Sequence, residues 1–227
     1  MANTLWKSQI NQDRWVAEVA MPGKTGGFFL EIGALDGVRF SNTYALEKHF
    51  GWTGLLIEAN PRTFSKISEN RTSLAVNACL DGKRGTVKFH LDKKFAMGGI
   101  VDDDTDYSKR LAKGKITEEH KGKIVEMDAL PLQDILVENA APSEIDYMSI
   151  DIEGAETRVL MPFPFEKYAF GVISIERPTN RLIEHLSLKG YEKVIKHKQD
   201  TFFAHRELTD VDRIKRDSES FFGSLGT

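Results

Sequence analysis

The chain has 227 residues, a length typical of one large domain or of one domain with additions. Its 41% hydrophobic and 29% charged residues are close to the averages for globular proteins, which excludes disorder as the main state. Thirty-one basic against thirty-four acidic side chains give a formal charge of −3, so we expect no nucleic-acid partner. Cys79 is the single cysteine, which excludes an internal disulfide, and no apolar run reaches the length of a membrane span. We therefore expect a cytoplasmic protein.

The first third of the chain alternates predicted strands and helices. Apolar runs predict buried strands, and helical spacing, helix caps and Pro61 predict the helices. The strands are predicted at 28–33, 54–58 and 73–78, and the helices at 3–20 (one helix or two short ones), 41–50 and 61–70. Strands and helices that alternate with short connections are typical of a parallel sheet covered by helices on both faces.

Beyond residue 80 the alternation is less regular. The run 85–91 predicts an exposed or edge strand, and the polar segment 92–122 has the length of a functional lid or a mobile insertion. Further strands are predicted at 124–127, 145–151 and 171–176, helices at 131–137, 153–160 and 181–188, and a closing hairpin at 191–195 and 201–205. The last twenty or so residues are polar, and we expect them to be loose.

Polar residues follow the end of the first predicted strand, in the sequence Glu31-Ile32-Gly33-Ala34-Leu35-Asp36-Gly37. The carboxyl ends of parallel strands meet at one edge of a sheet, beside the crevice that binds ligands. Gly33 allows a ligand to approach the backbone closely. The third glycine of the dinucleotide-binding motif is missing, and acids at this turn would repel a pyrophosphate. They suit a ligand that carries a positive sulfonium and an amine.

Glu58 ends the second predicted strand, twenty-five residues after Gly33. A carboxylate at this position can accept hydrogen bonds from two adjacent ribose hydroxyls. The glycine turn and Glu58 together indicate a cofactor of the adenosine type. Alternatively, these acids are ordinary turn residues.

Several stretches of the chain together resemble the FkbM family of methyltransferases. They are residues 28–37, 41–43, 46–48, 51–61 and 145–156, with Ser8-Gln9 and Gln12-Asp13 resembling the N-terminal segment of that family. The resemblance runs from about residue 8 to residue 205. It implies the Rossmann-like α/β fold of class I methyltransferases, with a central, mostly parallel seven-stranded sheet and helices on both faces. We expect that domain at 28–206, between an N-terminal helical segment at 1–27 and a polar C-terminal tail at 207–227.

The resemblance also implies S-adenosylmethionine (SAM) as cofactor and, usually, methylation of a hydroxyl on a sugar, lipid or other small-molecule or glycan acceptor. It assigns the cofactor site as follows: Glu31, Gly33 and Asp36 at the methionine end, Ser41 and Asn42 at its carboxylate, Glu58 and Ala59 at the ribose, and Ala78, Cys79 and Leu80 at the adenine.

Asp151 and Glu176 end the fourth and fifth strands of the predicted parallel sheet, where class I methyltransferases place the acceptor and the transferred methyl group. We predict both as catalytic residues, with Asp151 also beside the cofactor. One carboxylate could act as general base on the acceptor hydroxyl, or both could hold Mg²⁺. An N-methyltransferase, a non-catalytic SAM-binding module and a nicotinamide oxidoreductase are the alternatives. The sequence predicts neither the identity of the acceptor nor an oligomeric state.

Overall fold

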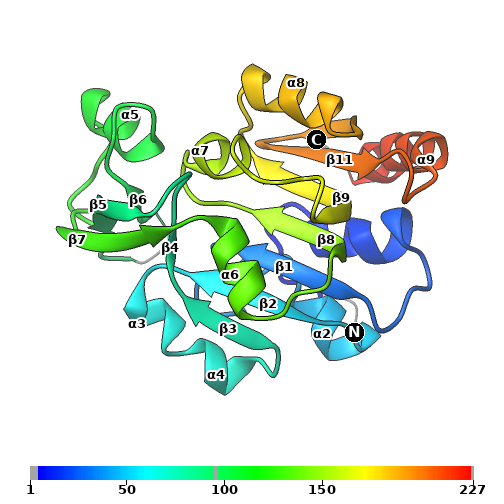
Figure 1. The fold of residues 1–227 in the computed structure, drawn as a ribbon, viewed down its shortest axis with the longest axis horizontal. Coiled ribbons are helices and arrows are strands. Elements are labelled where there is room, and N and C mark those ends of the chain that lie inside the picture. The colour runs from blue at the N-terminus through cyan, green and yellow to red at the C-terminus, as the bar shows by residue number, and fades with distance from the viewer. Residues whose placement is uncertain (1–4, 95–96, 226–227) are drawn as a thin grey trace.

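A computed structural model describes residues 5–94 and 97–225, and these form two β-sheets with helices around them (Figure 1). The strands of the larger sheet are β1 (Phe28–Ile32), β2 (Thr53–Glu58), β3 (Leu74–Asn77), β8 (Glu144–Ile150), β9 (Ala169–Glu176), β10 (Tyr191–His197) and β11 (Asp200–His205). Their order across the sheet is β10-β11-β9-β8-β1-β2-β3. β11 runs antiparallel to both of its neighbours, whereas the other pairs are parallel. The prediction of a mostly parallel seven-stranded sheet is confirmed.

Helices cover both faces of this sheet, as predicted. The helical elements are α1 (Gln12–Trp15), the π-helix η1 (Val16–Ala20), α2 (Tyr44–Phe50), α3 (Pro61–Phe64), α4 (Ile67–Asn70), α5 (Asp106–Ala112), α6 (Leu132–Glu138), α7 (Glu156–Leu160), α8 (Asn180–Leu188) and α9 (Val211–Ser224). One core forms where α6, α7 and α8 pack on the sheet. A second core forms on the opposite face, beneath α1, η1, α2, α4 and α9.

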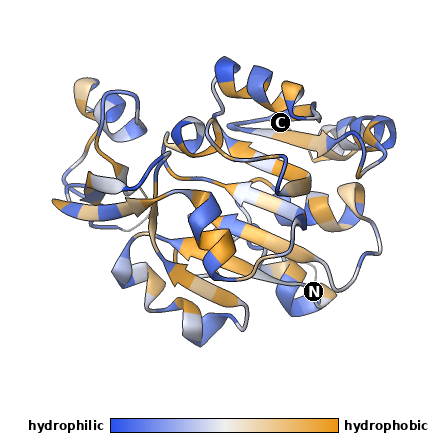
Figure 2. Ribbon diagram, viewed as in Figure 1, coloured by the Kyte–Doolittle hydropathy of each residue, from blue (hydrophilic) through white to orange (hydrophobic). Residues whose placement is uncertain are grey.

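The central strands are mostly apolar because both of their faces are covered (Figure 2). Every residue of β2 except Thr53 is buried, and the same holds for β1 except Phe28. Alternate residues of each strand therefore enter the two cores, which explains why the sequence shows continuous apolar runs there.

A smaller four-stranded sheet lies beside the larger one (Figure 1). It contains β4 (Cys79–Leu80), β5 (Gly85–Leu91), β6 (Gly99–Ile100) and β7 (Lys123–Leu130), in the order β4-β7-β5-β6. The predicted strand at 85–91 is present as β5, and its first half is largely exposed, as one of the two alternatives stated. It is not an edge strand, because it pairs with β7 on one side and with β6 on the other. The segment 92–122, expected to be irregular, contributes β6 and α5, and its residues 95–96 lie outside the described residues.

Three predicted helices have different bounds in the structure. The first begins at Gln12, after Asn11 adopts a left-handed conformation with φ of 66°, and residues 3–4 of the predicted helix lie outside the described residues. The helix expected at 61–70 is divided into α3 and α4. The helix expected from 153 begins at Glu156, because Glu153 and Gly154 have φ of 59° and 98°, which no α-helix accommodates.

The expectation of a loose C-terminal segment is wrong for residues 211–224, which form α9. Ile214, Ser218 and Phe222 lie four residues apart and are buried, so one stripe of a mostly polar helix packs on the sheet. The Ser218 hydroxyl accepts a hydrogen bond from Trp15 Nε1 at 2.8 Å, which joins α9 to the N-terminal helix. Residues 226–227 lie outside the described residues.

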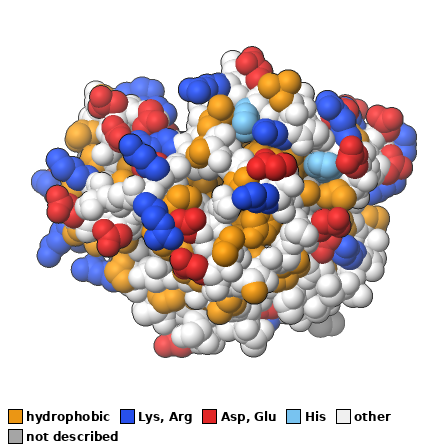
Figure 3. Space-filling view, in the orientation of Figure 1, with side chains coloured by type: hydrophobic (Ala, Val, Ile, Leu, Met, Phe, Trp, Pro, Cys, Tyr) orange, Lys and Arg blue, Asp and Glu red, His pale blue; other side chains and the backbone are white. Residues whose placement is uncertain are grey.

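On the face that carries α6, basic and acidic side chains are interspersed at the margins and apolar side chains gather near the centre (Figure 3). Within residues 5–94 and 97–225, none of the helices combines the length and the apolar character that crossing a bilayer requires.

Candidate active site

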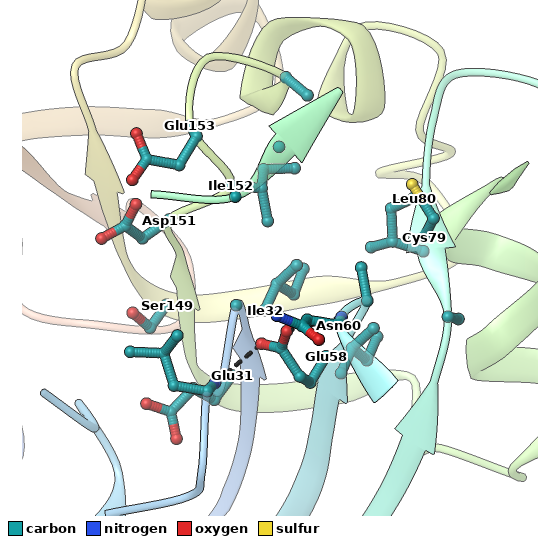
Figure 4. Close-up of a pocket in the computed structure, with 18 of the residues that line it drawn as sticks. Glu31, Ile32, Glu58, Asn60, Cys79, Leu80, Ser149, Asp151, Ile152 and Glu153 are labelled. Carbon is teal, nitrogen blue, oxygen red and sulfur yellow. Dashed lines mark hydrogen bonds between the residues drawn. The ribbon is translucent and has the colours of Figure 1, made fainter. Parts of the chain in front are cut away.

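A cleft opens at the carboxyl ends of β2, β1 and β8, which are neighbours in the larger sheet (Figure 4). Glu58 lies at the end of β2, Gly33 directly after β1, and Asp151 directly after β8, and all three line the cleft. Their convergence follows from the parallel pairing, which brings these carboxyl ends to a single edge of the sheet.

Gly33 lies in the wall of the cleft, close to the backbone of Asp151. Its φ is 89°, and a Cβ atom built on it would lie 2.0 Å from the Asp151 carbonyl oxygen. Its backbone N–H donates to the Ile57 carbonyl at 2.9 Å. Only glycine fits this position, so the turn after β1 can approach both the end of β8 and a ligand in the cleft.

Glu58 turns its carboxylate into the cleft and is 6% exposed. Oε2 accepts a hydrogen bond from the Leu35 N–H at 2.8 Å, and Oε1 accepts bonds from the Asn60 N–H at 2.8 Å and the Thr63 hydroxyl at 3.0 Å. Burial raises the pKa of Glu58 to about 7, although these bonds oppose the shift. These bonds fix the Glu58 carboxylate in position. Hydrogen-bond donors on a ligand would further stabilise its charged form.

Glu31 holds the segment before α2. Its carboxylate accepts bonds from the Ser41 hydroxyl at 2.9 Å, the Thr43 hydroxyl at 2.5 Å and the Asn42 N–H at 2.6 Å. The Arg71 guanidinium lies 3.5 Å away. Burial raises the pKa of Glu31, and these partners oppose the shift. Glu31 lines the cleft, but its carboxylate is already engaged in hydrogen bonds that hold the 41–43 turn in place.

Asp36 and Ser41, two of the predicted cofactor residues, are not among the described residues that line the cleft. Asp36 Oδ1 accepts bonds from the Val38 and Arg39 N–H groups at 3.1 and 2.8 Å, which closes its own turn. The Ser41 oxygen accepts from the Tyr44 N–H at 3.0 Å, at the start of α2. The structure therefore brings the neighbouring Asn42 to the cleft, and not these two side chains.

The predicted adenine end of the cleft is apolar. Ala59, Ala78, Cys79 and Leu80 line it, and Phe89 and Ile100 face it from the smaller sheet. Cys79 and Leu80 lie across the cleft from Ser149 and Asp151 (Figure 4). Burial raises the pKa of the Cys79 thiol to about 12, so Cys79 is a neutral packing residue.

Five carboxylates gather around the ends of β8 and β9, one of them, Asp106, from α5. Oxygens of Asp151, Glu156 and Glu176 all lie within 4.8 Å of one another, and Glu153 joins Glu176 and Asp106 in an overlapping group. Desolvation, then the negative charges of Glu176 and Glu153, raises the pKa of Asp151 well above its ordinary value. Burial raises the pKa of Glu153 and of Glu156 to about 7. Asp151 and Glu153 line the cleft, whereas Glu156 and Glu176, the second predicted catalytic residue, are not among the described residues that line it. The acidic cluster therefore meets the cleft through Asp151 and Glu153.

Two arginines partly balance this acidic group. Arg177 lies 2.5 Å from Glu176 and 2.8 Å from Asp106, and Arg110 of α5 lies 2.9 Å from Glu153. Carboxylate oxygens are ligands that Mg²⁺ accepts, so Asp151, Glu156 and Glu176 form a suitable donor set. A cation at this position would compete with the Arg177 guanidinium for Glu176.

Sequence reasoning missed several residues of the cleft. Ser149 is a polar residue inside a buried strand, and Asn60 lies two residues after Glu58, so both carried a signal in the sequence. The segment Gly98–Ile100 and Phe89 carried none, because only the pairing of β5 with β6 brings them to the cleft.

Residues 31–193 match the family model of the methyltransferase FkbM domain. The chain belongs to the FkbM methyltransferase family. The match includes the carboxyl ends of β1, β2 and β8, around which the cleft lies. The structure of this FkbM protein confirms the predicted Rossmann-like α/β fold.

Two solved structures are similar to the FkbM chain at low sequence identity. Precorrin-6y C5,15-methyltransferase from Geobacter metallireducens GS-15 is 13% identical, with 89% of this chain and 90% of that chain covered and a TM-score of 0.42. A chain of the fibrillarin/Nop5p complex is 12% identical, with 89% and 83% covered and a TM-score of 0.41. The comparison with curated proteins gave no match.

Proposed function

We propose that this FkbM methyltransferase uses SAM to methylate a hydroxyl oxygen of a small-molecule acceptor such as a sugar, a glycan or a lipid. The observation that carries the proposal is the placement of Gly33, Glu58 and Asp151 on three neighbouring strand ends around one cleft. One end of the cleft offers the Glu58 carboxylate, which can accept hydrogen bonds from ribose hydroxyls, and the other end carries further carboxylates. Such a cleft matches an adenosine cofactor with a cationic sulfonium.

The described residues fit SAM. Glu58 offers a buried carboxylate to the ribose hydroxyls, and Ala59, Ala78, Cys79 and Leu80 form an apolar wall for the adenine. No Lys or Arg is found among the described residues that line the cleft, whereas Glu31, Glu58, Asp151 and Glu153 are acids. This acidic lining favours a positively charged ligand over a pyrophosphate.

Asp151 and Glu176 would take up the proton of the acceptor. When bound, SAM supplies an electrophilic methyl group on a positive sulfur. Transfer of that methyl group to the acceptor oxygen would leave the electron pair of the carbon–sulfur bond on sulfur. The hydroxyl proton passes to Asp151, whose pKa is raised well above its ordinary value by desolvation and by the negative charges of Glu176 and Glu153, so that it binds a proton more tightly than an ordinary aspartate does.

Mg²⁺ is the alternative way to activate the acceptor. Asp151, Glu156 and Glu176 would hold the ion, which lowers the pKa of a hydroxyl bound to it. Activity that is lost in excess EDTA and restored by Mg²⁺ would support this alternative. Full activity in EDTA would leave proton transfer to the carboxylates as the mechanism.

An amine acceptor is the second candidate, because the acidic lining of the cleft would also attract a protonated amine. Methyl-labelled SAM should be incubated with a panel of sugars, glycans and lipids and with a matched panel of amines. We expect label in the hydroxyl compounds. Transfer to amines alone would contradict the O-methyltransferase proposal, and binding of SAM without transfer to any compound would support a non-catalytic binding module.

A further inference from the structure

A small set of exposed residues marks where the cleft opens to solvent. Gln9, Phe40 and Asp151 are exposed, whereas the other described residues that line the cleft are buried or half-buried. Solvent reaches Asp151 through the cleft, although protein surrounds its other sides. A ligand that lies along the buried walls would leave this opening free. A second molecule that enters from solvent therefore meets Gln9 and Phe40 beside Asp151.

Phe40 has a backbone conformation that large side chains rarely adopt. Its φ is 62°, in the left-handed region, and 42% of the residue is exposed. On one side Asp36 accepts the Arg39 N–H at 2.8 Å, and on the other Glu31 accepts the Asn42 N–H at 2.6 Å. Such strain is typical of functional sites, and an exposed ring adds little to the core, so we infer a role in binding.

Gln9 belongs to a short turn that buried side chains fix. Asp13 is fully buried, and its carboxylate accepts the Lys7 N–H at 2.8 Å. Gln12 Oε1 accepts the Ile10 N–H at 3.0 Å. The backbone is therefore held on both sides of Gln9, while Gln9 itself is exposed at the cleft.

The attachment of this turn indicates which end of the cleft Gln9 faces. Gln12 Nε2 donates to the buried Asp200 carboxylate at 2.9 Å, and Asp200 of β11 lies opposite Glu176 of β9. β9 is the neighbour of β8, on the side away from β2 and Glu58. If Glu58 holds the ribose, as the proposed function states, Gln9 lies in the half of the cleft that remains for the methyl acceptor.

We propose that Phe40 and Gln9 bind the methyl acceptor, Phe40 by packing its ring against an apolar face and Gln9 by a hydrogen bond to a neutral polar group. The inference rests on the proposed function. A glutamine amide is uncharged and offers both donors and an acceptor, so it suits a hydroxyl or an amide of the acceptor molecule. The acceptor class is therefore a neutral molecule with an apolar face and a polar group beside the atom that is methylated.

Steady-state kinetics test the proposal with the best-methylated compound from the panels of sugars, glycans, lipids and amines. The variants are Gln9→Ala, Phe40→Asn, which removes the ring but tolerates the left-handed conformation, and Phe40→Tyr, which keeps the ring. Gln133→Ala and the exposed Leu188→Asn are the matched controls, because neither residue lines the cleft. Calorimetry with S-adenosylhomocysteine on each variant measures cofactor binding separately.

We expect Phe40→Asn to raise the KM for the acceptor about tenfold or more and Gln9→Ala to raise it about threefold to tenfold. The affinity for S-adenosylhomocysteine and kcat should change far less, and Phe40→Tyr should retain most of the acceptor affinity. In urea unfolding, Phe40→Asn should be about as stable as the wild type. Gln9→Ala keeps the proposal testable if Phe40→Asn does not fold.

Four outcomes would overturn the inference. An unchanged KM for the acceptor in both folded variants would remove the two residues from the acceptor site. An equal or larger loss of S-adenosylhomocysteine affinity would assign them to the cofactor, and a large loss of stability in Phe40→Asn would make Phe40 structural. If the wild type methylates no compound of the panels, the proposed function fails, and the inference fails with it.

Discussion

Glu58 shows how a single side chain is prepared for a ligand. Both of its oxygens are held by backbone N–H groups, from Leu35 on one side and Asn60 on the other. Among residues 5–94 and 97–225, Oε2 accepts one hydrogen bond, so it keeps capacity for a further donor, which the proposed function identifies as a ribose hydroxyl. The carboxylate is therefore fixed in place before any ligand arrives.

Replacement of Glu58 by Gln should weaken the cofactor complex while the fold survives, since the residue lies at a strand end. A hydrogen bond to a charged group contributes about 1.5–3 kcal/mol, so the dissociation constant of S-adenosylhomocysteine should rise about tenfold or more. Calorimetry on Glu58→Gln measures it. The exposed Glu69→Gln is the matched control, and unchanged affinity in folded Glu58→Gln would remove Glu58 from the site.

The burial of Glu58 should also make the free energy of unfolding depend on pH. Its pKa is about 7 in the folded chain, against 4.5 as the ordinary value, so the folded state holds the proton more tightly. Its contribution to stability is complete below pH 4.5 and is lost as the pH rises through 7.

Between pH 5 and pH 8, the free energy of unfolding of the wild type should fall relative to that of Glu58→Gln by on the order of 3 kcal/mol. The comparison with the variant is needed because burial lowers the pKa of His90, His185, His197 and His205, which act in the opposite direction. Urea unfolding at both pH values measures the difference. Parallel pH profiles would contradict a buried, proton-binding Glu58.

Asp151 and Glu176 form the reactive pair of the proposal. Asp151→Asn removes a group that can accept a proton but keeps its shape, so turnover should fall by about 10²-fold or more. Affinity for S-adenosylhomocysteine should fall far less. Asp128→Asn, an exposed change in β7, is the control. A loss of 0.5–2 kcal/mol in stability with unchanged turnover would make Asp151 a structural cap.

At the scale of elements, the strands of the larger sheet were predictable because both of their faces are buried. The apolar runs that end at Glu58 and Asp151 place these acids correctly at strand ends. The turn after β8 was not predictable, since nothing local in the sequence shows that Glu153 and Gly154 adopt positive φ. That turn depends on Glu156, whose carboxylate accepts bonds from the Ile152 and Gly154 N–H groups at 2.9 and 3.3 Å.

Two other elements depended on distant contacts that the sequence does not display. The smaller sheet depends on pairing of β5 with β7 across the segment 92–122, so local pattern could not predict which cleft residues it supplies. α9 is polar on average, and only the spacing of Ile214 and Phe222 signals a packed helix.

The packing of α9 predicts a measurable cost for its loss. Phe222 is buried against Phe202 of β11, with ring centroids 5.2 Å apart. Phe222→Ala should destabilise the protein by about 3–5 kcal/mol, as for other buried aromatic residues. Denaturant unfolding measures the change, and Phe221→Ala, a neighbouring and less buried change, is the matched control. Equal and small effects of both changes would contradict the docking of α9.

At the scale of the whole molecule, the parallel sheet brings residues from distant parts of the sequence to one edge, and the smaller sheet closes the adenine end of the cleft. The ends of β2, β1 and β8 bring Glu58, the turn at Gly33 and Asp151 to the cleft in that order. Under the proposed function, these strand ends would hold the cofactor on a rigid support, and the methyl acceptor would approach beside Asp151.

Titration calorimetry of the wild-type protein with S-adenosylhomocysteine, SAM and NADH tests the cofactor assignment most directly. We expect both sulfur compounds to bind and NADH not to bind. At 100 times its dissociation constant, S-adenosylhomocysteine should stabilise the fold by about 2.7 kcal/mol in parallel unfolding measurements. Binding of NADH, with neither SAM nor S-adenosylhomocysteine bound, would contradict the assignment.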